Sequence, residues 1–358
     1  MALTPAARAL STAYPWTKTP LITGAPMLRI ALAPLAVAIS RAGGFGFLAA
    51  GFDVSDLETN LEHSAKLIRQ HQTETPGFTG ADKEILPIGI GFLNWGADLD
   101  RAIPLIGKYI PAAVWLFGAA RPTQELYNQW AKLVRSATRG KTKIWVQVGN
   151  VTDAVDIMRS VKPDVMVVQG CDAGGHGLKQ SASIISLLPE VKDALDAEGF
   201  GDTPLLAAGG IVDGRGVAAA LCLGADGVVM GTRFLACEEA SIARGYRDEV
   251  LRVRDGGAVT GRTTVYDRVR GINRWPEEYD GRGVLNKSFY DAENGMPDEE
   301  NQRLYEMEMK KGDEGWGPNG RMTTYAGTGV GLVKNVASAK DIIDGVLGET
   351  AEILSRRA

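Results

Sequence analysis

The amino-acid sequence predicts an α/β protein, a (β/α)8 TIM barrel with an appended C-terminal lid or small subdomain. Over the first 240 residues, short apolar runs rich in β-formers alternate with helix-length segments, which is typical of parallel βα units. Eight such runs occur, and glycine-rich clusters follow them. In (β/α)8 barrels the ligand-binding loops follow the carboxyl ends of the strands, so the position of the glycines agrees with this fold.

The eight apolar runs are the predicted strands, and their length and composition are those of buried parallel strands. They are LITGAP (21–26), GFGFLA (44–49), LPIGIGF (86–92), AAVWLF (112–117), KIWVQVG (143–149), DVMVVQG (164–170), PLLAAGG (204–210) and GVVMGT (227–232). Helical patterns lie between them, for example over 54–72, 123–140 and 152–161. A strand count of eight favours a closed barrel over an open doubly wound sheet.

The alternation of strands and helices stops near residue 250, which divides the chain into three predicted parts. Residues 1–250 form the barrel, and residues 251–335 form an appended lid or substrate-side segment rich in Gly, Trp, Tyr, Asn and charge. A surface or dimer-contact extension is an equal alternative for this segment. Residues 336–358 form a C-terminal helix that packs back on the barrel.

Composition excludes several classes of partner. The net charge is −4 and no run of Lys and Arg occurs, so we expect no nucleic-acid binding. No apolar run approaches the roughly 18 residues of a membrane helix. Cys171, Cys222 and Cys237 have no CxxC spacing and cannot all pair, which favours a reducing compartment. We expect a cytoplasmic monomer or homodimer, with a short organellar transit peptide as the alternative.

Two short glycine-containing loops point to a phosphate group. Gly209 and Gly210 follow the seventh strand, and Gly231 and Thr232 follow the eighth, each just before a helical segment. Backbone N–H groups exposed at such loops bind phosphate without a lysine, and barrels commonly place a phosphate site there. Arg233 would add a charge-assisted bond or cap the surface. The alternative is that the glycines only form tight turns.

The loop after the first strand, GAPM, combines a proline-fixed turn with a methionine and is suited to lie against a flat apolar ring. It comprises Gly24, Ala25, Pro26 and Met27.

One of the three histidines has the sequence context of a catalytic group. His63 and His71 lie in a polar helical segment and are expected to face solvent, whereas His176 follows the sixth strand and stands among glycines. Imidazole titrates near neutral pH, so it can take a proton from a substrate. A hydrogen-bonded loop histidine is the alternative. Only Asp172 offers a further metal ligand nearby, so we predict no metal site.

Several motifs in the same order resemble those of the nitronate monooxygenases, formerly called 2-nitropropane dioxygenases. They span residues 20 to 270 and read GAPM, LAVAISRAGGFGFLAAG, VVQGCDAGGHG, LLAAGGIVDGRGVAAALCLGADGVVMGTRFLACEEA and VTGRTTVYDRVRG. The resemblance implies an FMN-binding barrel that oxidises alkyl nitronates with O2 to a carbonyl compound and nitrite.

The resemblance also implies roles for individual residues. His176 would be the base that removes the α-proton of a neutral nitroalkane, and Gln169 would hydrogen-bond the flavin. The GAPM loop would lie against the isoalloxazine ring, and Gly174 and Gly175 would allow close approach of backbone and flavin. The FMN phosphate would be held by Gly209, Gly210, Met230, Gly231, Thr232 and Arg233.

The chain departs from the family pattern at three places. Gly91 stands where many relatives have an asparagine, so that polar contact is missing or is supplied by Asn94. Asp172 replaces the usual glutamate. Trp115 or Leu116 stands where one subgroup has a histidine.

Two other functions remain open from the sequence. One is an FMN-dependent reductase that takes hydride from NAD(P)H to enoyl thioesters or quinones, and the other is a flavin-free barrel that binds a phosphorylated metabolite. The resemblance suggests propionate 3-nitronate as substrate, and the candidates for binding its carboxylate are Arg262, Arg268 and Arg270, without a ranking.

Overall fold

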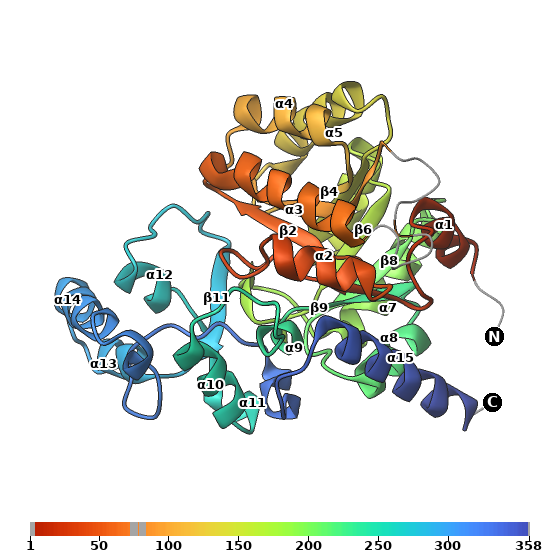
Figure 1. Ribbon diagram of the computed structural model, residues 1–358. Helices are drawn as coiled ribbons and strands as arrows, with labels where there is room; N and C mark the ends of the chain where they lie inside the picture. Colours follow the sequence, from red (N-terminus) through yellow and green to blue (C-terminus); the bar gives the residue numbers. More distant parts are fainter. Residues whose placement is uncertain (1–3, 72–77, 79–83, 357–358) are drawn as a thin grey trace.

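The computed structural model describes residues 4–71, 78 and 84–356, and its central feature is a parallel barrel (Figure 1). Eight strands are hydrogen-bonded in the order β1-β9-β8-β6-β5-β4-β3-β2. Phe45, just before β2, closes the ring, because its N–H donates to Ile22 O (2.9 Å) and its carbonyl accepts from Gly24 N (3.0 Å). The predicted barrel is confirmed. The strands are β1 (Leu21–Gly24), β2 (Phe47–Gly51), β3 (Leu86–Leu93), β4 (Pro111–Phe117), β5 (Lys143–Val148), β6 (Val165–Gln169), β8 (Leu205–Ala208) and β9 (Gly227–Met230).

Helices cover the outside of the barrel. They are α2 (Ala33–Arg41), α3 (Leu57–His71), α4 (Leu99–Tyr109), α5 (Thr123–Ala137), α6 (Val151–Ser160), α7 (Ile184–Ala197) and α8 (Gly214–Cys222). The helix that follows β9 directly, α9 (Thr232–Leu235), is a single turn. The C-terminal helix α15 (Ala339–Ser355) packs against α8 and α2 and so completes the ring between them (Figure 1).

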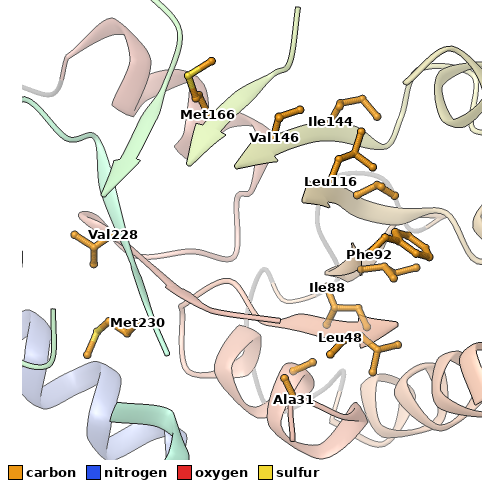
Figure 2. Packing of buried hydrophobic residues seen from close by; sticks show 14 of the residues in the cluster. Ala31, Leu48, Ile88, Phe92, Leu116, Ile144, Val146, Met166, Val228 and Met230 are labelled. Carbon is orange, nitrogen blue, oxygen red and sulfur yellow. The ribbon is translucent and has the colours of Figure 1, made fainter. Parts of the chain in front are cut away.

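The core has two layers because side chains alternate between the two faces of each strand. Ile144 and Val146 of β5 face the helices and belong to the outer cluster drawn in Figure 2. Trp145 faces inward, where it packs with Trp115 and Tyr14 inside the barrel. Gln147 is the next residue of β5 that faces inward, and it lies near the carboxyl end of the strand.

The first helix closes the lower end of the barrel. Helix α1 (Pro5–Ala13) begins after Thr4, whose hydroxyl donates to Asp226 Oδ1 (2.6 Å) just before β9 starts. Trp145 Nε1 donates to the hydroxyl of Tyr14 (2.7 Å) directly beyond this helix. Side chains therefore fill the barrel interior up to the carboxyl ends of the strands, and the open space lies beyond those ends.

Residues 244–332, which we call the cap, lie over the carboxyl ends of the strands. The first cap helix spans the predicted boundary at residue 250. The cap elements are α10 (Arg244–Arg252), α11 (Gly256–Val259), β10 (Thr260–Thr263), α12 (Val265–Val269), β11 (Tyr279–Val284), α13 (Lys287–Glu293), α14 (Asp298–Met309), η2 (Gly312–Gly315) and η3 (Thr328–Leu332).

An antiparallel sheet joins the cap to the barrel chain. Its order is β10-β11-β7, and β7 (Gly175–Leu178) is the segment that contains His176. His176 stands opposite Gly281 of β11. The sequence predicted a glycine-rich loop here, and the segment is a strand because a partner about one hundred residues later in the chain supplies the pairing (Figure 1).

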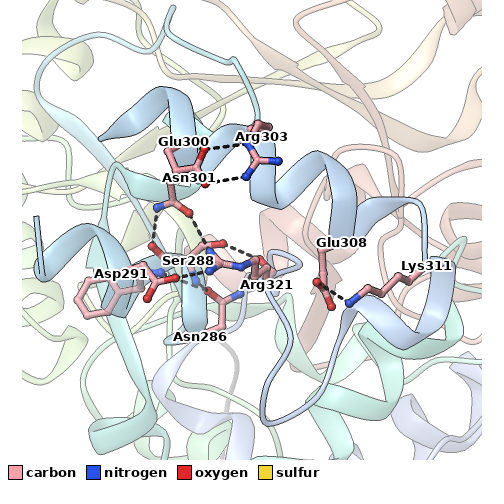
Figure 3. A network of polar contacts seen from close by, with 10 residues as sticks. Asn286, Ser288, Asp291, Glu300, Asn301, Arg303, Glu308, Lys311 and Arg321 are labelled. Atoms are coloured by element: carbon pink, nitrogen blue, oxygen red, sulfur yellow. Dashed lines mark hydrogen bonds and ion pairs between the residues drawn. The ribbon is translucent and has the colours of Figure 1, made fainter. Parts of the chain in front are cut away.

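A buried polar network stabilises the outer part of the cap (Figure 3). The guanidinium of Arg321, which is 5% exposed, pairs with Asp291 of α13 and donates to Asn301 Oδ1 of α14 (3.2 Å). The carbonyl of Arg321 accepts from Asn286 Nδ2 (2.9 Å) and from the Ser288 hydroxyl (3.1 Å). A buried charge is tolerated when it is paired and hydrogen-bonded in this way, so the network joins α13, α14 and the following loop.

Candidate active site

A cavity of about 860 Å³ lies between the strand ends and the cap. Residues from most of the strand-end loops line it, as the barrel fold predicts. Of the residues to which the sequence analysis assigned a catalytic or flavin-binding role, the lining contains Ala25, Pro26, Met27, Gln169, Gly174, Gly175, His176, Gly209, Gly210, Gly231 and Thr232.

Three of the residues with such a predicted role do not line this cavity. Gly24 pairs with Met230 between β1 and β9. A Cβ on Gly24 would lie 2.4 Å from Ile39 Cδ1, so this position faces α2, and Met230 is fully buried in the outer core. The guanidinium of Arg233 donates to Asn335 O (3.1 Å). Contact of these three residues with a ligand in the cavity is therefore not supported.

Backbone conformation explains several glycines of the cavity wall. Gly209 and Gly210 have φ values of +110° and +74°, a region that side chains other than glycine rarely adopt. Gly175 has a φ of +71°, and a Cβ there would meet no atom within 4 Å. Gly174 is different, because its Cβ would lie 2.4 Å from the backbone of Ala326 and Gly327 in the cap. Gly174 thus allows the cap to pack closely on the loop after β6.

The side chain of His176 is fixed from several directions. Its ring stacks on Trp275, with ring centroids 3.9 Å apart and an interplanar angle of 7°. Nε2 lies 3.0 and 2.9 Å from Asp267 Oδ1 and Oδ2. The backbone carbonyl of His176 accepts a hydrogen bond from Gln169 Nε2 (3.2 Å), so Gln169 supports the strand that carries the histidine.

Asp267 is itself held in place. It is 5% exposed, and its Oδ1 accepts a hydrogen bond from the hydroxyl of Tyr325 (3.1 Å). Burial, together with the negative charge of Asp267, raises the pKa of Tyr325 well above its ordinary value, so the phenol stays protonated and donates. Among the described residues, no lysine or arginine forms an ion pair with Asp267, and His176 is its charge partner.

Gln147, at the carboxyl end of β5, is a cavity residue that the sequence analysis missed. Its Oε1 accepts from Trp115 Nε1 (3.2 Å), whereas its buried Nε2 has no hydrogen-bond partner among the described residues. A buried amide donor without a partner is costly, so it points to a ligand acceptor in the cavity. The sequence contained a signal for it, because Gln147 is the last but one residue of β5 and Gln169 is the last residue of β6.

The structure separates the three candidate arginines. Arg262 donates to Gly177 O (2.9 Å) and pairs with Asp280 (2.6 Å), so it joins β7 to β11. Arg268 pairs with Asp298 at the surface. Arg270 lines the cavity, with its guanidinium carbon 5.7 Å from the ring centroid of Tyr325, and within the described part of the chain it forms no ion pair with an acid.

Two of the departures from the family pattern have structural explanations. A Cβ on Gly91 would lie 2.3 Å from Pro26 Cβ, so glycine lets the GAPM loop pack on β3. Asn94 does not supply the polar contact in its place, since it does not line the cavity and its Oδ1 accepts from Phe117 N (2.8 Å). Asp172 accepts from Thr328 at both its carbonyl (3.0 Å) and its Oδ1 (3.2 Å), and so fastens the loop to the cap.

Two features are absent from the part of the chain that the structure describes. Across residues 4–71, 78 and 84–356, no cluster of three or more His, Cys, Asp and Glu side chains has the arrangement of a metal site. No helix in this part of the chain has the length and apolar character required to cross a membrane. His63 is exposed on α3, whereas the side chain of His71 lies outside the described residues.

The fold and the cavity define a class, namely (β/α)8-barrel enzymes with a small-molecule cavity at the strand ends, here lined by a histidine in contact with a carboxylate. Comparison with known proteins specifies the family. Residues 89–349 match the family model described as "Nitronate monooxygenase". The chain is 45% identical over 351 residues to nitronate monooxygenase npaC of Metarhizium robertsii, covering 97% of this chain and 96% of that protein.

A second relative, the nitronate monooxygenase of Neurospora crassa, is 36% identical over 361 residues, covering 97% of this chain and 93% of that protein. The chain therefore belongs to the nitronate monooxygenase family and is an oxidoreductase.

Two solved structures share the fold. Nitroalkane oxidase from Streptomyces ansochromogenes has a TM-score of 0.72 at 22% identity and covers 98% of this chain and 100% of its own. FabK from Thermotoga maritima has a TM-score of 0.70, also at 22% identity, and covers 100% and 99% respectively. At this level of identity the two likenesses support the barrel architecture and nothing further.

Proposed function

We propose that the chain is an FMN-dependent nitronate monooxygenase that oxidises alkyl nitronates with O2 to a carbonyl compound and nitrite. We further propose that it accepts neutral nitroalkanes, with His176 as the base. The observation that carries the proposal is that one cavity contains both the predicted flavin loops and His176.

The cavity residues fit an FMN group. The partnerless Nε2 of Gln147 offers a hydrogen-bond donor to a flavin oxygen, and the GAPM loop offers an apolar surface for the ring. Gly209 and Gly210 present bare backbone in the region where barrels bind phosphate, and Gly231 precedes α9 on the same side. When bound, FMN would accept electrons from the nitronate and pass them to oxygen.

The protein's own groups prepare the substrate. A neutral nitroalkane must lose the proton on the carbon next to the nitro group, and an imidazole at the cavity wall is suited to accept it near neutral pH. Arg270 is the proposed partner of the negative charge that results, because it lines the cavity without an acidic partner in the described part of the chain. His176 is partly buried, and Trp275 covers one face of its ring.

The test uses two substrates, one variant of the proposed base and one control variant. Purified protein is expected to be yellow and to oxidise both ethyl nitronate and nitroethane. His176→Asn should lower kcat/KM for nitroethane by about 10²- to 10⁴-fold, because general-base catalysis is lost, and should largely spare ethyl nitronate. His63→Asn, which changes an exposed histidine on α3, is the matched control and should behave as wild type. Equal loss on both substrates would count against the role of His176.

The alternatives have distinct signatures. Rapid bleaching of the flavin by NADH without oxygen would favour the reductase of enoyl thioesters or quinones. A colourless protein that cannot be reconstituted with FMN would favour the flavin-free phosphometabolite barrel. The three cysteines are free thiols, which supports a cytoplasmic location as part of the same proposal.

A further inference from the structure

We propose that Asp267 is a positioning residue that holds the Nε2–H of His176 and thereby makes Nδ1 the atom that accepts the substrate proton. This inference rests on the proposed role of His176 as the base. It assigns a tautomer and a reacting atom to that histidine, and it gives the cap a direct part in the proton transfer.

The hydrogen-bond geometry selects the tautomer. Both oxygens of Asp267 lie near Nε2, at 3.0 and 2.9 Å, and an ionised carboxylate only accepts hydrogen bonds. Nε2 must therefore carry a proton. A neutral imidazole has only one N–H, so Nδ1 keeps its lone pair. Among the described residues Nδ1 has no hydrogen-bond partner, and His176 lines the cavity, so this lone pair is available to a substrate.

The orientation of the ring has little freedom. Trp275 covers one face of the imidazole in parallel stacking. The Tyr325 hydroxyl holds Asp267 Oδ1, and opposite His176 on β11 a Cβ at Gly281 would lie 2.7 Å from Tyr325 Cε1. The backbone of His176 is paired with β11. A rotation that brought Nε2 toward the substrate would break the contact with Asp267.

The charges around the histidine favour a proton on Nδ1 during the reaction. Asp267 is buried, and His176 is the group that can neutralise it directly. On the neighbouring strands, Arg262 and Asp280 compensate each other. Arg282 of β11 donates to Cys171 O (3.1 Å), so it is directed to the loop after β6. A buried carboxylate next to an imidazole stabilises the imidazolium, and here the stabilisation arises only as the proton arrives.

Arg270 is the other charged group near this pair, and its positive charge opposes the imidazolium. It forms no ion pair with Asp267, whose two oxygens are closer to Nε2 than to any arginine nitrogen of the described residues. We therefore assign Arg270 to the substrate anion and Asp267 to the histidine.

The proposed step is balanced within the site. The C–H bond next to the nitro group breaks, its proton forms a bond with Nδ1, and its electron pair moves into the nitronate. No oxidant is consumed in this step. The proton on Nδ1 leaves to solvent after the product departs.

The tautomer can be measured directly because the chain has only three histidines. In the double variant His63→Gln/His71→Gln, His176 is the single histidine, and ¹⁵N-histidine labelling resolves its two ring nitrogens by NMR. At pH 8 we expect Nε2 to carry the proton and Nδ1 to show the shift of an unprotonated nitrogen. Adding Asp267→Asn, whose amide can donate to Nε2, should move the proton to Nδ1.

Kinetics provide the second readout. Asp267→Asn should lower kcat/KM for nitroethane about 100-fold and for ethyl nitronate less than threefold, because only the neutral substrate needs deprotonation. Asp298→Asn makes the same chemical change on an exposed cap residue and is expected to match wild type. Flavin content and far-UV circular dichroism of the isosteric Asp267→Asn protein report whether it folds, and the NMR measurement stands independently of turnover.

The outcomes are distinguishable from those of the proposed function. Wild-type protein without flavin or without nitronate turnover would overturn the proposed function, while the tautomer measurement would still decide the role of Asp267. A proton on Nδ1 in the protein with Asp267 intact would overturn the inference. So would an unchanged ratio of nitroethane to ethyl nitronate activity in Asp267→Asn.

Discussion

Gly174→Ala is the substitution whose consequence follows most directly from the geometry. A Cβ at this position would lie 2.4 Å from Ala326 C and Gly327 N and 2.7 Å from Ala326 Cα. These are backbone atoms, so a side chain cannot simply rotate aside. An ordinary carbon contact is about 3.5 Å or longer, and the two segments must therefore separate by roughly 1 Å.

The separation has a calculable cost. Overpacking of this kind destabilises by about 1–3 kcal/mol. The same movement stretches the two bonds between Thr328 and Asp172, from N to O (3.0 Å) and from Oγ1 to Oδ1 (3.2 Å), each worth about 1 kcal/mol. We expect a total loss of about 3 kcal/mol in the free energy of unfolding. The contact that is weakened is the one between the cap and the loop that leads to His176.

Urea denaturation measures this loss. With an m-value of about 3 kcal/mol/M, the midpoint should fall by about 1 M. Gly257→Ala is the matched control, because a Cβ there meets no atom within 4 Å. A midpoint within about 0.2 M of wild type for Gly174→Ala would refute the reasoning, since the cap would then be able to move away from the loop at no cost.

Three further substitutions test the cavity. Gln147→Leu removes the partnerless amide and should weaken FMN binding about fivefold, as measured by fluorescence titration of the apoprotein; unchanged affinity would mean that this donor faces no ligand acceptor. Tyr325→Phe should lower kcat/KM for nitroethane about threefold to tenfold. The reduction should be constant from about pH 7 to 9, because the raised pKa keeps the phenol protonated, and a reduction that varies with pH would contradict this. Arg270→Ala should raise KM for ethyl nitronate at least about tenfold and for nitroethane less, whereas an equal rise would argue against pairing with the anion.

The barrel could be predicted from the sequence because its strands are apolar on both faces. Most strands appear as a continuous run such as VMVV, with a glycine at or directly after the last residue. The same local signals located His176 and the glycines of the cavity wall. They were less informative about Gly24 and Met230, because the direction of a residue at the last position of a strand depends on the register with its neighbour.

The cap residues of the site could not be located in this way. Asp267, Trp275 and Tyr325 meet His176 only through the pairing of β7 with β11, and the sequence GHGL has no pattern of a strand. Such pairing depends on contacts distant in sequence. Gln147 could have been predicted from the sequence, because ligand binding is one of the few functions that place a polar side chain inside a barrel at the end of a strand.

The pairing of β7 with β11 also constrains how molecules enter and leave. A cap that swung open as a rigid body would pull β11 away from β7 and carry Asp267 and Trp275 off the histidine. We therefore expect substrate and product to enter and leave while the cap stays in place. Met309 is one of the cavity-lining residues that also reach the surface, and it is 53% exposed, so we expect a change in its size to alter which molecules pass there.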